Sequence, residues 1–362
     1  MKLLIQKRDN VTPIQRIENV VVCILLAMAF CAIFILGYGE NPFLVYWKML
    51  KTAFGSVRGL SNSIVYAIPL MLCSLGVSVA FKMGLNNIGA EGQYTMGAFA
   101  ATGIALYCNF IPEKLTIPAM VLAAFVAGAI WGVIAIIPKA FWNVNETIIT
   151  LMLNYVAILF VDYLCFGPWI DKDINLPVSK TIPDYAKMKS YFGTNINAGV
   201  IIAIVCAILI YLFFKYTVAG YQIKVISKNI TAAHYAGLEV VKKILFVMLV
   251  SGGISGMAGF AQVSGQVYKL QTGIANNAGF TGIVIAYLSK FNPFVVLLVS
   301  IFFGGLTIGG YSVQTMGIPS QVVTMLQGAI LIFVLGGELV GKYKVSVLKN
   351  AAKIKKEIKE AA

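Results

Sequence analysis

The chain has 362 residues, of which 59% are hydrophobic and only 12% charged, and its mean hydropathy is +0.85. Because an average soluble domain is about 25% charged, this composition excludes an ordinary soluble protein and indicates a membrane protein. The net charge of +14 does not indicate a nucleic-acid partner, since the lysines and arginines lie between and beyond the apolar runs and form no basic face with stacking aromatics.

Ten apolar runs have about the 20 residues that a helix needs to cross the hydrocarbon core of a bilayer. They lie at about 19–38, 62–81, 87–108, 117–137, 147–166, 198–215, 244–263, 273–289, 292–309 and 319–337. The first run follows a basic segment, but it is too long for the apolar part of a signal peptide and no A-x-A cleavage site follows, so we interpret it as a retained span. The sequence therefore predicts an all-α polytopic membrane protein with about ten transmembrane helices in a single domain, 1–362.

The distribution of Lys and Arg predicts that both termini are cytoplasmic, because cytoplasmic segments of membrane proteins are enriched in these residues. The C-terminal segment 338–362 is a basic tail on that side. Lys48, Lys51 and Arg58 depart from the rule, because this orientation places their loop, 39–61, outside.

Two longer polar segments separate the spans. Segment 167–197 has mixed charge and prolines, and it is predicted to be an external excursion. Segment 216–243 is basic and cytoplasmic, and Asn229 or Thr231 could cap a short helix that Gly237 ends. A short helix of small residues between two spans is suited to docking on a partner.

Small residues four apart predict close helix packing within the membrane. The pairs are Gly128 with Gly132, Gly252 with Gly256, and Gly305 with Gly309.

Amides, a carboxylate and glycines interrupt the apolar pattern between Asn86 and Gln93. Polar or irregular backbone at membrane depth is tolerated only where protein or a water-filled path satisfies it. This segment is therefore predicted to line a path or act as a hinge, with a plain cytoplasmic turn as the alternative.

Four carboxylates lie in or near the spans, where ionisable groups are costly. Glu91 and Glu146 could be functional or could pair with Lys82 or Lys139. Asp162 is interpreted as structural and Glu338 as interfacial.

Four ordered motifs resemble the permeases of the branched-chain amino acid and ribose class of ATP-binding cassette (ABC) importers, in the branch associated with nucleosides and simple sugars. They are NNIGAEGQ at 86–93, NETIITLMLNY at 145–155, NITAAHYAG at 229–237 and GFTGIVIA at 279–286. Ile230 departs from the usual Pro of the third motif, and Tyr287 stands near a usual small aliphatic position.

The resemblance implies inverted repeats, here about 62–166 and 244–337, with 216–243 as the cytoplasmic coupling loop. It implies an importer in the bacterial plasma (inner) membrane, in which a separate ATPase drives inward movement of nucleosides, or simple sugars, by alternating access. The implied partners are an ATP-binding subunit with duplicated nucleotide-binding domains, a second permease subunit of a different chain, an external substrate-binding lipoprotein and membrane lipid.

Two groups of site residues follow from the resemblance and the polar segments. The predicted translocation path contains Asn86, Asn87, Glu91, Gln93, Asn276, Asn277, Phe280 and Thr281. The predicted contact with the ATPase contains Asn229, Ala232, Ala233, His234, Tyr235 and Gly237.

Other chemistries find little support in the residues. The run 336–343 nearly fits a phosphate-binding loop, but Tyr343 replaces the hydroxyl that binds magnesium and no strand precedes it, so we predict no ATPase in this chain. The single histidine, His234, cannot build a triad or a multi-histidine metal site, and the cysteines are not paired, so neither an enzyme nor a metal or other cofactor is predicted. An ion-coupled secondary transporter of a small polar solute is the alternative function.

Overall fold

The computed structural model describes residues 2–7, 13–108, 110–174, 176–191, 193–319 and 321–348. The chain divides into two compact units. The terminal unit combines Met1–Val45 with Val313–Ala362, and the central unit is Tyr46–Ser312. The predicted basic tail lies outside the described residues from position 349 onward.

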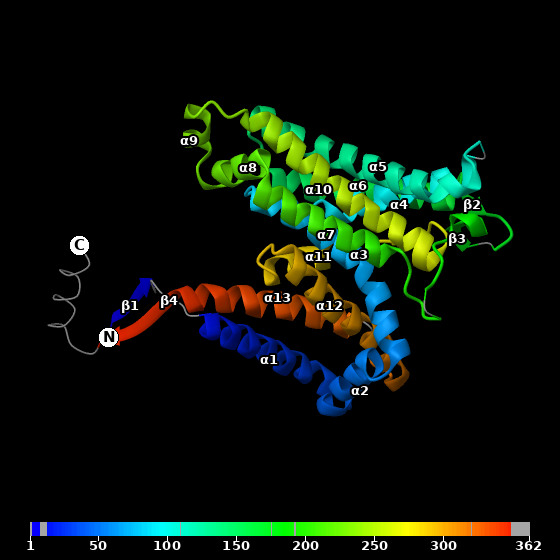
Figure 1. The fold of residues 1–362 in the computed structure, drawn as a ribbon. Coiled ribbons are helices and arrows are strands. Elements are labelled where there is room, and N and C mark those ends of the chain that lie inside the picture. Colours follow the sequence, from blue (N-terminus) through cyan, green and yellow to red (C-terminus); the bar gives the residue numbers. More distant parts are fainter. Residues whose placement is uncertain are drawn as a thin grey trace. The chain divides into compact units, whose positions relative to one another are not determined.

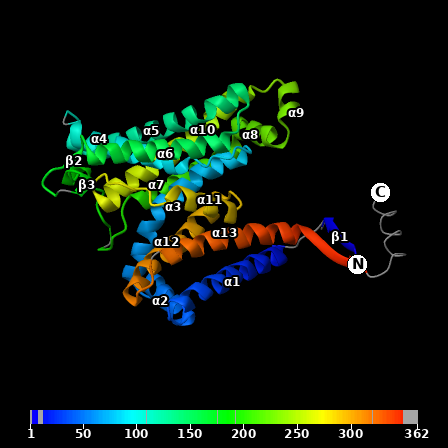
Figure 2. The ribbon, with the colours of Figure 1, turned by 180° about the vertical axis from the view of Figure 1, so that it is seen from behind.

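The terminal unit is built on two helices that lie side by side, α1 (Pro13–Gly37) and α13 (Gln321–Lys342) (Figures 1 and 2). The rings of Phe30 and Phe333 pack between them, with centroids 6.1 Å apart. Strands β1 (Lys2–Lys7) and β4 (Tyr343–Leu348) pair antiparallel beyond the helices. The short helix η3 (Gln314–Met316) precedes α13.

The central unit holds most of the remaining helices. They are α3 (Val57–Lys82), α4 (Ala90–Tyr107), α5 (Glu113–Trp142), α6 (Glu146–Phe166), α7 (Gly199–Tyr216), α8 (Val218–Lys228), α9 (Ile230–Tyr235), α10 (Val240–Gln262), α11 (Ala278–Leu288) and α12 (Pro293–Val313). Helix α2 (Pro42–Phe54) spans the boundary between the units. A π-helix, Val263–Val267, extends α10. Helix α10 lies at the centre, because α3, α4 and α5 all pack against it.

The predicted close approach of small residues is confirmed where α10 crosses α5 and α4. A Cβ atom added at Gly252 would lie against the backbone oxygen of Gly128, and one added at Gly97 would meet the backbone of Gly256. Because backbone meets backbone here, no side chain could move aside to make room. Glycine at these positions sets the separation of the three helices.

All ten predicted spans fall on helices, and the all-α polytopic class is confirmed. Among the described residues, six helices are by themselves long and apolar enough to cross a membrane, or seven if α1 and the bent continuation α2 form one span. Helix α4 is not among these helices, because the polar residues of its first turn lower its mean hydropathy. Helix α11 has 11 residues, a length of about 16 Å, and the described part of α13 contributes the apolar stretch Gln321–Val334.

The two polar segments lie at opposite ends of the central unit (Figure 1). One end carries strands β2 (Ile170–Asp171) and β3 (Leu176–Ser179) with the short helix η1 (Asp184–Ala186), and the other end carries α8 and α9. This arrangement is the one that segments on opposite sides of a membrane require.

Candidate translocation site

The polar turn between α3 and α4 is a packed hydrogen-bond network. Asn87 Nδ2 donates to Gln93 Oε1 (3.1 Å) and to Ser251 Oγ of α10 (2.9 Å). Asn87 Oδ1 accepts from the backbone N–H of Gly89 (2.9 Å). The side chains of Asn87, Gln93 and Ser251 are fully buried. Because each polar group has a partner, the network joins the turn to α10 without exposing its amides.

Helix α6 holds the other side of the same turn. Asn154 Oδ1 accepts from the N–H of Gly92 (2.8 Å), and its Nδ2 donates to the carbonyl of Ile88 (2.9 Å). The Thr150 hydroxyl accepts from the N–H of Ile88 (3.3 Å). The turn is thus fixed by side chains on both flanking helices, as irregular backbone at membrane depth requires.

Glu146 is paired within the chain. Its carboxylate lies 3.4 Å from Lys139 Nζ and accepts from the backbone N–H of Asn86 (3.3 Å). Of the alternatives left open by the sequence, this geometry selects the ion pair with Lys139.

Glu91 joins the two predicted path segments directly. Its Oε1 accepts from the N–H of Asn277 (2.9 Å) and its Oε2 from the N–H of Gly279 (2.7 Å). The carboxylate of α4 therefore caps the N-terminus of α11, where unpaired N–H groups and the helix dipole favour a negative charge. A Cβ atom at Gly279 would lie against the backbone nitrogen of Glu91, so glycine is needed for this contact.

The segment that leads into α11 has an unusual backbone. Asn276 (φ 45°) and Asn277 (φ 61°) are both in the left-handed region, which Asn tolerates better than most residues. Their side chains are exposed, whereas Phe280 and Thr281 are half-buried. These two amides form an accessible, uncharged hydrogen-bonding surface beside the buried Glu91.

The predicted external excursion is attached to the stretch before this segment. Ser179 donates its N–H to the carbonyl of Leu270 (2.8 Å), and its hydroxyl accepts from the N–H of Leu270 (2.9 Å). Met188 donates its N–H to the carbonyl of Ser264 (2.9 Å). Segment 167–197 thus packs on residues 264–271, which lead directly to Asn276.

The excursion also carries an exposed ion pair. Lys187 Nζ lies 2.6 Å from the Asp184 carboxylate, and this hydrogen bond lowers the pKa of Asp184 below its ordinary value. Such a surface pair contributes little to stability.

A small cavity of about 30 Å³ lies between α4, α6 and the segment before α11, and its lining includes Glu91, Thr95, Asp162 and Gly273. It is large enough for one water molecule. Asp162 Oδ1 is buried with no hydrogen-bond partner among the described residues. Among the residues that the structure describes, no three His, Cys, Asp or Glu side chains are placed to hold a metal ion.

The predicted coupling helix is α9. Asn229 caps it by accepting from the N–H of Ala232 (3.0 Å), and Gly237 follows it with φ 73°, so the predicted Asn229 cap and Gly237 stop are confirmed. Tyr235 is 89% exposed, and its neighbour His234 is exposed as well.

The predicted contact role of Ala233 needs correction. Its side chain is fully buried, because it faces the inside of the loop. Asn229, Ala232 and Gly237 are exposed, so the surface that α9 offers consists of these residues with His234 and Tyr235.

The structure divides the predicted path residues by exposure. Asn87, Glu91 and Gln93 are buried, whereas Asn86, Asn276 and Asn277 are exposed. The sequence reasoning missed Thr150, Asn154 and Ser251 as partners of the turn. The sequence contained a signal for these three residues: each is a polar side chain inside an apolar span, and such a side chain usually has a partner on a neighbouring helix.

Known proteins resemble the chain over most of its length. The branched-chain amino acid transport system permease component family matches residues 59–335. The glucose ABC transporter permease of Haloferax volcanii is 32% identical over 90% of this chain and 89% of its own. The nucleoside ABC transporter permease of Lactococcus lactis is 30% identical over 86% and 89%, and the guanosine ABC transporter permease of Bacillus subtilis is 29% identical over 86% and 91%.

The fold and the site define a multi-pass membrane transport subunit. The chain belongs to the family of branched-chain amino acid transport system permease components. This family consists of ABC permeases, and the four sequence motifs are typical of it. It is the permease of an importer and not itself an enzyme. Family membership decides against the ion-coupled secondary transporter.

Proposed function

We propose that the chain translocates nucleosides, with simple sugars as the second candidate, into a bacterial cell across its plasma membrane. The observation that carries this proposal is the pair of exposed amides, Asn276 and Asn277, beside a carboxylate that is already bonded to the N-terminus of α11. Amides can hydrogen-bond ribose hydroxyls and base edges, and no fixed charge is offered to the solute.

The relatives support the same solute chemistry. Three of them are named as permeases for glucose, nucleosides and guanosine, all polar solutes rich in hydroxyl groups. Ribose and glucose hydroxyls would both suit Asn276 and Asn277, whereas a free purine base would find fewer partners.

We further propose that a separate ATP-binding subunit with duplicated domains docks on α9. An exposed aromatic side chain such as Tyr235 is the kind of residue that anchors protein interfaces. A second, different permease chain would complete the path, and a substrate-binding lipoprotein would meet the opposite end, where segment 167–197 lies. In this arrangement both termini are cytoplasmic.

The proposed mechanism is alternating access between the two predicted repeats, 62–166 and 244–337. Glu91 lies in the first repeat and caps α11 in the second, so the contact joins the two. Closure of the ATPase would move α9 and then α10, which follows it in the chain and bonds to Asn87 through Ser251. Movement of α10 would in this way reach the turn before α4 and, through it, Glu91 in the first turn of that helix.

Uptake by the reconstituted importer tests the substrate. Proteoliposomes that contain both permeases, the ATPase and the lipoprotein are supplied with labelled guanosine, and unlabelled nucleosides or glucose compete. We expect ATP-dependent uptake that nucleosides inhibit. Competition by glucose alone would contradict the nucleoside assignment and support the sugar.

Co-purification tests the docking of the ATPase. We expect Tyr235→Ala to reduce the amount of ATPase that co-purifies with the permease. Tyr191→Ala, at an exposed tyrosine of segment 167–197, should leave that amount unchanged. Equal recovery of the ATPase with both variants would show that α9 is not the docking helix.

A further inference from the structure

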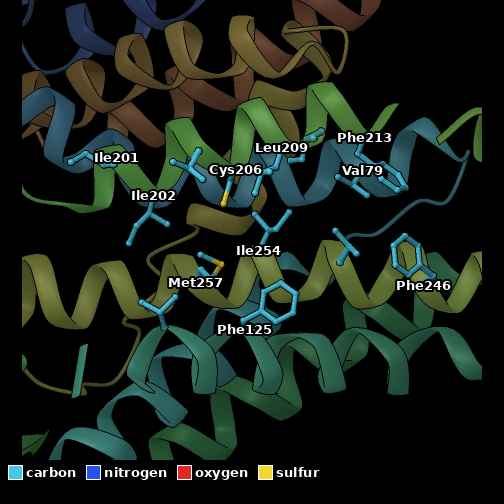
Figure 3. Close-up of a pocket in the computed structure, with 14 residues that line it drawn as sticks. Val79, Phe125, Ile201, Ile202, Cys206, Leu209, Phe213, Phe246, Ile254 and Met257 are labelled. Carbon is cyan, nitrogen blue, oxygen red and sulfur yellow. The ribbon is translucent and has the colours of Figure 1, made fainter. Parts of the chain in front are cut away.

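A large apolar pocket lies away from the candidate translocation site, between α7, α10, α5 and α3 (Figure 3). Its volume is about 490 Å³, and every side chain that lines it is apolar or cysteine. A pocket of this size is within the range of about 300–1,000 Å³ that small-molecule sites occupy. Nothing in it can hydrogen-bond a polar solute, so it does not fit a nucleoside or a sugar.

Helix α7 presents three different faces. Ala203, Ala207 and Phe214 are buried in the central unit. Ile202, Cys206, Leu209 and Phe213 line the pocket in a stripe three or four residues apart. Ile204, Ile208 and Leu212 are exposed and lie outside the pocket. One side of this helix thus stands against a space that the chain itself does not fill.

The four helices around the pocket are all long and apolar enough to cross a membrane. The space between them therefore lies at the depth of the hydrocarbon core. An apolar space at this depth is suited to a hydrocarbon chain, because dispersion contacts are lost wherever close-packed side chains face a void.

The pocket has two ends, which different residues line. Figure 3 shows Val79, Phe213 and Phe246 toward one end of the pocket, and Ile201, Ile202 and Met257 toward the other. The rings of Phe213 and Phe246 are 5.9 Å apart.

Two lysines lie about one helical turn beyond this end of the pocket, on two of the helices that line it. Lys82 lies three residues after Val79 on α3, and Lys243 lies three residues before Phe246 on α10, so each shares a helix face with a lining residue. Lys82 Nζ is 4.5 Å from the ring centroid of Phe214. Lys224 is also near this end, because its Nζ donates to the carbonyl of Phe214 (2.7 Å).

We propose that the pocket binds one acyl chain of an anionic phospholipid, whose phosphate lies at Lys82 and Lys243. The apolar stripe fits the chain, and the lysines fit the headgroup. Basic side chains between transmembrane helices are the usual partners of anionic lipid headgroups. The lipid would fill the space between α7 and α10 and so support the position of α10, on which α3, α4 and α5 pack.

Lipid retention measured by native mass spectrometry tests the proposal. The chain is purified from nanodiscs of phosphatidylglycerol and phosphatidylcholine in equal amounts, and the lipids that remain bound are counted. We expect one retained phosphatidylglycerol. Cys206→Phe, which fills the pocket, should abolish retention, whereas Ile208→Phe, on the face of α7 outside the pocket, should preserve it.

The lysine variants test the headgroup separately. Lys243→Gln should lower the preference for phosphatidylglycerol about fivefold, the factor for one basic side chain near an anionic lipid surface. Lys242→Gln is the matched control, because this exposed neighbour is paired with Glu239. Equal retention of both lipids by the unmodified chain, or retention that survives Cys206→Phe, would overturn the proposal. A change of oligomeric state in Cys206→Phe with unchanged lipid would also overturn it and would identify the pocket as an interface between chains.

Discussion

The two polar segments that meet at Glu91 differ in what their amides do. In the turn before α4 and the first turn of that helix, Asn87 and Gln93 are buried and bonded to each other, and Asn87 is also bonded to α10. In the segment before α11, the side chains of Asn276 and Asn277 are exposed, and the backbone N–H of Asn277 is bonded to Glu91. Similar residue types thus serve as a rigid support in one segment and as an accessible surface in the other.

The difference has a physical cause. The turn before α4 is enclosed by α6 and α10, whose Asn154 and Ser251 satisfy its polar groups. The segment before α11 has left-handed backbone at both asparagines, which directs the chain into α11 while their side chains remain accessible. Burial of a polar group is tolerated only with partners, so the first segment is predicted to matter for stability and the second for the solute.

Loss of the Glu91 carboxylate is expected to have the largest effect on stability. Glu91→Ala leaves the N–H groups of Asn277 and Gly279 without acceptors in a buried site, and we expect a loss of about 2–4 kcal/mol. Glu91→Gln keeps an acceptor oxygen and should lose less. Thermal unfolding of the purified chain in detergent measures both, and equal stability of Glu91→Ala and the unmodified chain would contradict the capping role.

Gly279→Ala is expected to have the next largest effect, because the added methyl group meets the backbone of Ala90 and Glu91. Overpacking of this kind costs about 1–3 kcal/mol. Gly328→Ala in α13 is the control, since no described atom beyond its own stretch of helix lies within 4 Å of the added Cβ there. If the two variants unfold at the same temperature, the close contact between α4 and α11 is not present in solution.

Removal of the Asn87 amide should have a moderate effect. Asn87→Ala loses the bonds to Gln93 and Ser251, and we expect a loss of about 1 kcal/mol, since hydrogen bonds between membrane helices are modest. Ser251→Ala removes one partner, and the double variant should lose less than the sum of the two. Additive losses would show that the two side chains do not interact.

The smallest effect on stability is expected at the exposed asparagines. Asn276→Gly removes the amide while keeping a residue that adopts positive φ without strain, so stability should change by less than about 0.5 kcal/mol. Uptake should nevertheless fall, because the solute loses a hydrogen-bonding partner. Normal uptake by Asn276→Gly in the reconstituted importer would remove this residue from the proposed path.

The sequence predicted the helices and the positions of the polar segments, because hydropathy and amide-rich interruptions depend on local composition. It could not predict which of Asn87 and Asn276 is buried, since that depends on partners such as Asn154 and Ser251 on helices distant in the sequence. It also did not predict that α11 has only 11 residues, where the apolar run suggested a longer helix. Ala233 shows the same limit, because burial of one face of a short helix depends on the elements that pack around it.

Accessibility to a water-soluble thiol reagent tests the contrast between the two segments most directly. Asn87→Cys and Asn276→Cys are introduced singly into a chain without its native cysteines, and each is labelled in the assembled importer with and without substrate. We expect rapid labelling at position 276 that substrate slows, and no labelling at position 87. The opposite result, in which position 87 is labelled and position 276 is protected even without substrate, would contradict this account. The turn before α4 would then not be the rigid support, and the segment before α11 would not line the path.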